Sequence, residues 1–553
     1  MKKVISVLLS LVMILSLAVP AFAAAETFTS AGIRKNIPII RISGDGVPLY
    51  DNNTGEKLLH YKDLLGGLNK DEDSDNSEIY KSIANVLLPF IIEGIANDKW
   101  DNYYKNLQKE IGELFGDTLL DKNGDPVEGT GLSNDTVKSL EYDMTHDKKD
   151  RYGNYAVWTY FFQYDWRLDP METADKFNEY IKGVKKATNS EKVGIMASCL
   201  GSSITMAYIA KYGTDDICGV TMDGSVVNGA ELLSETISGK FKIDGDAINR
   251  FLIDCDGFGL FSVNDFITST VDLLTKSGAI DSVTGVVKEK LYYKLVQGVT
   301  SALALSTFYT WPSYWSGVSA DDYQDALEYV FGPEGSEKRT EYAGLIAKLD
   351  NYDKEVRQKL PELFSQVKED GVNLGIMAKY GCQIAPVVES RDELGDQFAS
   401  VNKASLGATT SKVYGTLSDE YIAKRVAEGK GKYISPDKQI DASTCQFPDY
   451  TWFVKGVTHS NWTSQEETLL WRVATAEKQI TVADTDSTQF MIYNNDTKTM
   501  SPMTATNHNT YFWSRESGYD KPETPIDKLF SLIRSILRWL NLVFEKISAR
   551  SVA

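Results

Sequence analysis

Short apolar runs rich in β-branched residues alternate along this chain with longer segments of helical periodicity. The runs that we predict to be strands lie at residues 36–43, 156–162, 192–197, 217–225, 383–390 and 450–456. Short buried strands separated by helices are typical of an α/β fold, a mostly parallel central sheet with helices on both faces. Ligands of such sheets bind at the carboxyl ends of the strands. We therefore expect the functional residues in the loops that follow these runs.

Two long insertions interrupt the alternation. Residues 50–150 contain a helical pattern around Tyr80–Ile95 and several polar loops, and residues 226–375 are mostly helical and rich in large apolar side chains. Helical insertions at the top of a sheet are typical of a cap over a pocket. The alternative is additional packing with no gating role.

The stretch "KVGIMASCLGSS", residues 192–203, goes from an apolar run through small residues into a predicted helix. A nucleophile elbow needs small residues two before and two after the nucleophile, because the turn is very tight. Ala197 and Gly201 meet this need if Cys199 is the nucleophile, whereas Ser198 would place larger residues there. A thiol at a helix N-terminus loses its proton more easily. The alternative is a buried structural cysteine.

A catalytic thiol requires a base, and the chain has four histidines: His60, His146, His459 and His508. His459 follows the last predicted strand, which is where this architecture places its histidine. The acid is expected in the preceding loop, and we predict Asp437 in "YISPDKQIDAST". Asp441 competes with it, and Asp396 in "ELGDQF" is the second candidate.

Acyl chemistry also requires two backbone donors for the developing oxyanion. The amide of Leu200, directly after the nucleophile, is one candidate. The other is the amide of Asp45 in "SGDG", after the first predicted strand. Gly44 and Gly46 on either side leave room for a substrate carbonyl.

The two ends of the chain have compositions of their own. Two lysines, an apolar run and a small-residue site predict a secretory signal, residues 1–23, cleaved near Ala23. Residues 24–515 would form the α/β-hydrolase domain. Residues 516–553 predict a linker and a basic amphipathic helix, which can lie on a membrane surface, dock on its own domain or pair with a second chain.

The composition of the chain limits the classes of ligand that we expect it to bind. The net charge of −19 repels nucleic acid, so nucleic-acid binding is excluded. The five cysteines show no zinc-type pairing and leave at least one thiol free. We expect no metal and no organic cofactor.

Four motifs resemble the lecithin:cholesterol acyltransferase and lysosomal phospholipase group of α/β-hydrolases. They are "ISGDG", "YDWR" at residues 164–167, "SCLGSS", and the tail "SPDKQIDAST…VKGVTH". The chain differs from the group by having Cys199 in place of serine and Ser198 in place of histidine. The resemblance implies an acyl-ester hydrolase or transacylase that acts on lipids. Asp165 and Arg167 are expected to form a structural ion pair under the elbow.

The sequence thus predicts a secreted, lipase-like hydrolase or acyltransferase with a Cys199–His459–Asp437 triad and a thioester acyl-enzyme. Its partner would be an acyl lipid or another ester. The competing hypothesis is an inactive descendant that binds lipid or a cell-surface partner.

Overall fold

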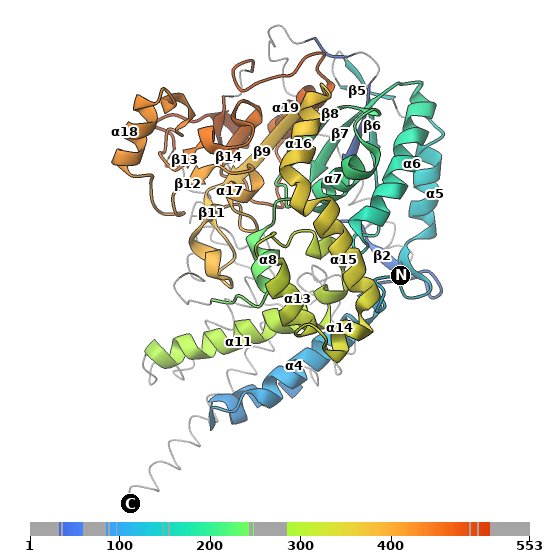
Figure 1. Ribbon diagram of the computed structural model, residues 1–553, viewed down its shortest axis with the longest axis vertical. Helices are drawn as coiled ribbons and strands as arrows, with labels where there is room; N and C mark the ends of the chain where they lie inside the picture. The colour runs from blue at the N-terminus through green and yellow to red at the C-terminus, as the bar shows by residue number, and fades with distance from the viewer. Residues whose placement is uncertain are drawn as a thin grey trace, which may run out of the picture.

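The computed structural model describes residues 32–34, 37–58, 85–86, 89–95, 97–147, 149–152, 155–242, 247, 251, 285–485, 488–494 and 497–508. A nine-stranded sheet lies at the centre of the molecule (Figure 1). Its strands in spatial order are β16 (Thr499–Pro502), β15 (Phe490–Asn494), β14 (Thr451–Lys455), β9 (Asn373–Tyr380), β8 (Ile217–Asp223), β7 (Val193–Ser198), β1 (Pro38–Ile42), β6 (Tyr155–Phe161) and β5 (Lys149–Tyr152). Only the edge strands β5 and β16 pair antiparallel. The predicted α/β fold with a mostly parallel sheet is confirmed.

Alternate residues of the central strands face opposite sides of the sheet, as the two-residue period of a strand requires. Ile40 and Ile195 pack on the face that carries α6 (Pro170–Thr188), α7 (Leu200–Tyr212) and α16 (Leu360–Glu369). Ile39 and Met196 pack on the other face against α19 (Ser464–Thr475). Both faces are therefore apolar and covered by helices.

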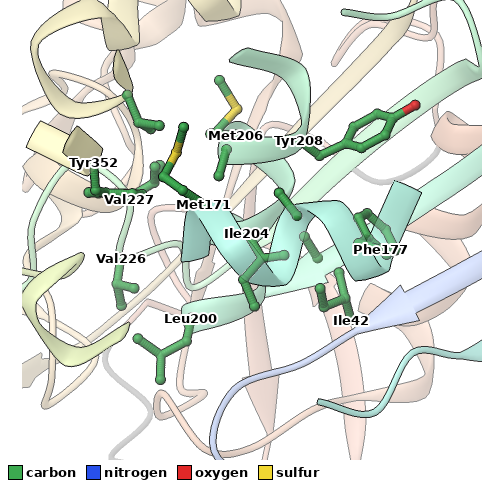
Figure 2. Packing of buried hydrophobic residues seen from close by; sticks show 14 of the residues in the cluster. Ile42, Met171, Phe177, Leu200, Ile204, Met206, Tyr208, Val226, Val227 and Tyr352 are labelled. Atoms are coloured by element: carbon green, nitrogen blue, oxygen red, sulfur yellow. The ribbon is translucent and has the colours of Figure 1, made fainter. Parts of the chain in front are cut away.

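Helix α7 is buried along its first three turns because apolar or small residues occupy all of its sides. Figure 2 shows Leu200 and Ile204 of α7 in one apolar layer with Ile42 of β1 and Phe177 of α6. The helix that begins at the elbow is thus fixed by the core on either side.

The predicted strand at residues 383–390 is wrong. The central strand is β9, which ends at Tyr380, before the predicted run. Gln383, the first residue of that run, belongs to the two-residue strand β10 (Cys382–Gln383). Pro386 lacks the N–H that a central strand needs. The hydrophobic pattern did not predict β9 because Lys379, a buried charged residue, interrupts its apolar run. The strands β15 and β16 were also not predicted.

The first insertion forms small strands and helices at the edge of the core. Its elements are β2 (Leu49–Asp51), β3 (Glu56–Lys57), η1 (Phe90–Ile95), α4 (Asp101–Leu114), η2 (Gly116–Thr118), β4 (Thr130–Leu132) and α5 (Asn134–Asp143). Strand β2 pairs with both β3 and β4.

The second insertion is helical, as the sequence indicates. Its described elements before α16 are α8 (Glu231–Ile237), α11 (Gly285–Ser306), η4 (Phe308–Thr310), α12 (Pro312–Trp315), α13 (Tyr323–Phe331), α14 (Glu337–Glu341), α15 (Ala343–Glu355) and η5 (Arg357–Lys359). Helices α4 and α11 lie side by side, away from the sheet (Figure 1). Their contact is aromatic and apolar, so the two insertions share a hydrophobic cluster.

A long connection joins β9 to β14. It contains β10 (Cys382–Gln383), η6 (Glu389–Asp392), β11 (Leu394–Gly395), α17 (Val401–Ala404), β12 (Thr409–Thr410), α18 (Asp419–Ala427), η7 (Gly431–Tyr433), β13 (Ile440–Asp441), η8 (Ala442–Thr444) and η9 (Pro448–Tyr450). This connection supplies both candidate acids.

The predicted signal segment at residues 1–23 and the predicted C-terminal helix at residues 516–553 lie outside the described residues. Within the described ranges, no helix has the length and apolar character needed to cross a bilayer.

Candidate functional site at the carboxyl edge of the sheet

Cys199 occupies the turn between β7 and α7 with φ 48° and ψ −128°. Positive φ is unfavourable for a residue with a side chain and persists only where the surroundings impose it. The Cys199 amide donates to the Asp223 carbonyl at 3.3 Å, and the Ser202 hydroxyl donates to the Cys199 carbonyl at 2.6 Å. The thiol is therefore held at the tip of a tight bend.

The need for a small residue at Gly201, two positions after Cys199, has a steric reason. A Cβ added to Gly201 would lie 2.2 Å from the carbonyl oxygen of Ile42 in β1. A larger residue would force β1 and α7 apart. The spacing argument that selects Cys199 rather than Ser198 thus has a steric basis in this fold.

His459 follows β14 and is paired with Asp396. The His459 amide donates to the Asp396 carbonyl at 2.9 Å, and Nδ1 lies 2.8 Å from Asp396 Oδ2. The other oxygen of Asp396 accepts the amides of Phe398 and Ala399 at 3.0 and 2.9 Å. Asp396 is therefore fixed as a carboxylate: burial raises its pKa, but the His459 charge and these hydrogen bonds lower it overall.

The choice of Asp437 as the acid is corrected by this geometry. Asp437 accepts hydrogen bonds from the Ser435 and Tyr380 hydroxyls at 2.6 and 3.1 Å and forms an ion pair with Lys455 at 2.9 Å. Its carboxylate is thus engaged by its own loop and by residues at the ends of β9 and β14, and Asp396, the second candidate, is the carboxylate that contacts His459. Asp441 is also occupied, because Arg425 pairs with it at 2.7 Å.

The Cys199 thiol is a second neighbour of the His459 ring. Nε2 is buried and makes no hydrogen bond of standard geometry within the part of the chain that the structure describes. Burial lowers the pKa of the ring, but Asp396 and the Cys199 sulfur, through charge and side-chain contact, raise it more strongly, to about 10. The imidazole therefore interacts with both the Asp396 carboxylate and the Cys199 sulfur.

Two further contacts fix the imidazole ring. The Phe398 ring stacks on it with centroids 4.6 Å apart. A Cβ on Gly224, which has φ +52°, would lie 3.4 Å from His459 Nδ1 and Cε1. A side chain at Gly224 would press on the ring.

The turn after β1 lies over the elbow and carries Asp45, one of the two predicted oxyanion donors. A Cβ on Gly44 would lie 3.1 Å from the Cys199 sulfur and 3.8 Å from the Leu200 nitrogen. Leu200 begins α7, so its N–H has no carbonyl partner from the helix itself. The neighbouring Asp45 carboxylate accepts the Tyr314 hydroxyl of α12 at 2.8 Å, which joins the cap to this turn.

The "YDWR" motif supports the same turn. The Tyr164 hydroxyl donates to the Ser43 carbonyl at 2.6 Å, and Trp166 Nε1 donates to the Val47 carbonyl at 2.9 Å. Asp165 and Arg167 form a buried ion pair at 2.7 Å, and Arg167 also donates to a carbonyl of the first insertion. The expected structural ion pair is present.

Sequence reasoning missed a second charged layer behind the site. Lys379 of β9 and Asp223 at the end of β8 form an ion pair at 2.7 Å, and their side chains are 1% and 0% exposed. Glu466 of α19 is also buried, which raises its pKa to about 7. Asp223 lies near the carboxyl end of the predicted strand at residues 217–225, and this position was the only signal that could have identified it.

The remaining histidines and cysteines are not part of this cluster. His146 is exposed, His508 is half-buried, and His60 lies outside the described residues. The four cysteines that the structure describes are free thiols, and of these Cys218, Cys382 and Cys445 are buried. No group of side chains suited to a metal ion occurs among the described residues.

Two cavities of about 320 and 280 Å³ lie elsewhere in the molecule. The larger is lined by Asp169, Lys211 and Lys348, and the smaller by Glu231, Lys240 and Asp322, among others. Neither includes Cys199 or His459, so chemistry rather than cavity size identifies the site.

Comparison with known proteins names no family. No family model matches the chain, and no curated protein matches it. Among solved structures, the chain is similar to the crystal structure of a Tle4-Tli4 complex, with 10% sequence identity and a TM-score of 0.24 over 62% of this chain and 75% of the other. A likeness at this level supports no conclusion about function, which is argued below from the site.

Proposed function

We propose that this protein is a thiol-dependent acyl-ester hydrolase or acyltransferase with Cys199 as nucleophile, His459 as general base and acid, and Asp396 as the acid that orients His459. The observation that carries the proposal is the placement of His459 between the Asp396 carboxylate and the Cys199 sulfur at a strained elbow. A structural cysteine would not require an imidazole held by a buried carboxylate.

The first half of the reaction transfers the acyl group to sulfur. Because the pKa of His459 is raised to about 10, the ring is protonated near neutral pH, so the proton that Cys199 gives up rests on Nε2 before the ester binds. The sulfur then attacks the ester carbonyl to form a C–S bond. The amides of Leu200 and Asp45 stabilise the oxyanion. The intermediate then expels the alcohol, which takes the proton from Nε2 and leaves a thioester on Cys199.

The second half releases the acyl group. Water, or an acceptor alcohol or amine, gives a proton to His459 and attacks the thioester carbonyl. The C–S bond breaks, the sulfur recovers the proton from Nε2, and a carboxylic acid, ester or amide leaves. Asp396 keeps Nδ1 protonated throughout, so Nε2 remains free to accept the proton.

Lipids are the proposed substrates, because the chain resembles lipid acyltransferases and phospholipases in its motifs and because the cap is rich in aromatic residues. We also propose secretion, on the signal-like residues 1–23. The mass of the mature protein recovered from the medium tests this second point: a chain that still begins at Met1 would reject it.

The experiment measures hydrolysis of p-nitrophenyl acyl esters of several chain lengths. Cys199→Ala is expected to lose activity by on the order of 10⁴-fold or more. Iodoacetamide should label Cys199 in the native protein and abolish turnover. Cys218→Ala is the matched control, because it removes a buried thiol near the start of β8, at the opposite end of the strand from Asp223, and should retain activity.

Unchanged hydrolysis in Cys199→Ala would reject the enzymatic proposal. Absence of turnover and of labelling would favour the inactive, ligand-binding alternative. Cys199→Ser tests whether the reaction needs a thiol or only a nucleophile at this position. Substantial retained activity would show that sulfur is not essential.

A further inference from the structure

The buried Lys379–Asp223 pair has no part in the reaction described above, yet it lies directly behind the reacting groups. The Lys379 ammonium is 2.7 Å from Asp223 Oδ2, and both side chains are almost fully excluded from solvent. Removing such charges from water is costly unless each finds a partner. The pair is therefore expected to serve a purpose that an apolar pair could not.

Each member of the pair is connected to a different part of the site. The Asp223 carbonyl accepts the Cys199 amide, and Gly224 lies against His459. Lys379 donates to the Asn461 carbonyl at 2.7 Å, in the loop that carries His459. The two residues thus link the elbow, the end of β8 and the histidine loop.

The charges of the pair also act on the imidazole. The Asp223 carboxylate interacts electrostatically with both His459 and Asp396, and Lys379 interacts with Asp396. Burial raises the pKa of Asp223, and Lys379 acts against this rise. Without the ammonium, Asp223 would be a second unpaired carboxylate beside His459.

We propose that Lys379 is a positioning residue for the Cys199–His459 couple: its ammonium holds Asp223 in an ion pair, offsets the charge of this second carboxylate, and leaves Asp396 as the acid that pairs with His459. The inference rests on the proposed function for the pairing of Cys199 with His459. It does not depend on which acyl group is transferred.

The charged and titratable groups that face the couple come from every element around it. They are Asp396 from the β9–β14 connection, Asp223 from β8, Lys379 from β9, Glu466 from α19, and Asp45 and Tyr164 on the side of the sulfur. Apart from His459 itself, Lys379 is the cation of this set. Its loss makes the surroundings of the couple more negative, and loss of Asp223 makes them more positive.

The test is the pH dependence of Cys199 alkylation by iodoacetamide, followed by mass spectrometry of the Cys199 peptide. Lys379→Met should move the alkylation profile to higher pH, by on the order of one pH unit, because negative charge disfavours the thiolate. Asp223→Asn should move it to lower pH by less, because Glu466 still partners Lys379. The double variant Lys379→Met/Asp223→Asn should return the profile toward that of the parent.

Lys455→Met is the matched control. It also breaks a buried Lys–Asp pair, with Asp437 at 2.9 Å, on the adjacent strand β14. Its profile should not move, although its stability should fall.

Opposite shifts in the two single variants, with return in the double variant, support the proposal. If the alkylation profile of Asp223→Asn lies at the same pH as that of the parent, the proposal is overturned. This result is decisive even if Lys379→Met does not fold. Alkylation requires no ester substrate. Failure of ester hydrolysis therefore rejects the proposed function without affecting this measurement.

Discussion

Replacing Asp396 with asparagine separates the two candidate acids. Asp396 Oδ1 accepts two backbone amides and Oδ2 accepts Nδ1–H of His459. The single oxygen of asparagine must satisfy the amides, so its NH₂ group would face Nδ1. Nδ1 would then have to be unprotonated, and Nε2 would carry the hydrogen and could not accept the Cys199 proton.

We expect kcat for ester hydrolysis to fall by about 10⁴-fold in Asp396→Asn, the size of the effect when a triad acid is replaced in this way. This corresponds to about 5.5 kcal/mol of transition-state stabilisation. The assay is p-nitrophenyl ester hydrolysis normalised to folded protein, with circular dichroism to confirm folding.

Asp437→Asn is the matched comparison. It leaves Lys455 without its charged partner, so the free energy of unfolding should fall by about 3 kcal/mol. Turnover per folded molecule should be unchanged, because Asp437 does not contact His459. Loss of turnover in Asp437→Asn together with normal turnover in Asp396→Asn would refute the assignment.

Three further predictions concern the elbow and the charged groups around it. Gly201→Ala places a methyl group 2.2 Å from the Ile42 carbonyl oxygen, and chemical denaturation should show a loss of about 3 kcal/mol. Cys199→Ala removes one of the groups that raise the pKa of His459, so an NMR titration should give a lower pKa than in the parent. The pKa of Glu466 in the folded state is raised from 4.5 to about 7. Its contribution to the free energy of unfolding is therefore present below pH 4.5 and is lost as the pH rises through 7. Glu466→Gln should remove this loss of stability in denaturation measured from about pH 4 to 8.

Each of these predictions has a control. Gly116→Ala adds a methyl group where no atom lies within 4 Å, and it should be nearly neutral. Glutamine keeps the capping box of α19, so Glu466→Gln changes charge without removing the cap. An unchanged pH slope in Glu466→Gln, or an unchanged His459 pKa in Cys199→Ala, would contradict the arrangement described here.

The sequence was sufficient for the strands on either side of the elbow and for the elbow itself. The strands before and after Cys199 are continuous apolar runs, and the register of small residues selects Cys199 as the candidate nucleophile because Gly201 contacts β1. His459 could be placed because few histidines exist and one of them follows a strong strand. These features depend on local pattern and on the general topology of parallel sheets.

The acid could not be chosen from the sequence. Asp396 and Asp437 lie in one long connection whose strands are only two residues long, and only its folded course shows which carboxylate reaches the imidazole. Lys379 interrupted the apolar pattern of β9 and thereby shifted the predicted strand to residues 383–390. The hydrophobic pattern of one strand cannot reveal a buried ion pair, because the second charged residue lies on another strand.

Mass spectrometry of the intact protein after brief exposure to acyl donors is the most direct test for an acyl-enzyme on Cys199. We expect a mass increase of one acyl group, located on the peptide that contains Cys199, labile to neutral hydroxylamine as a thioester, and absent in Cys199→Ala. An acyl group on another residue during productive turnover, or turnover that continues in Cys199→Ala, would contradict this expectation.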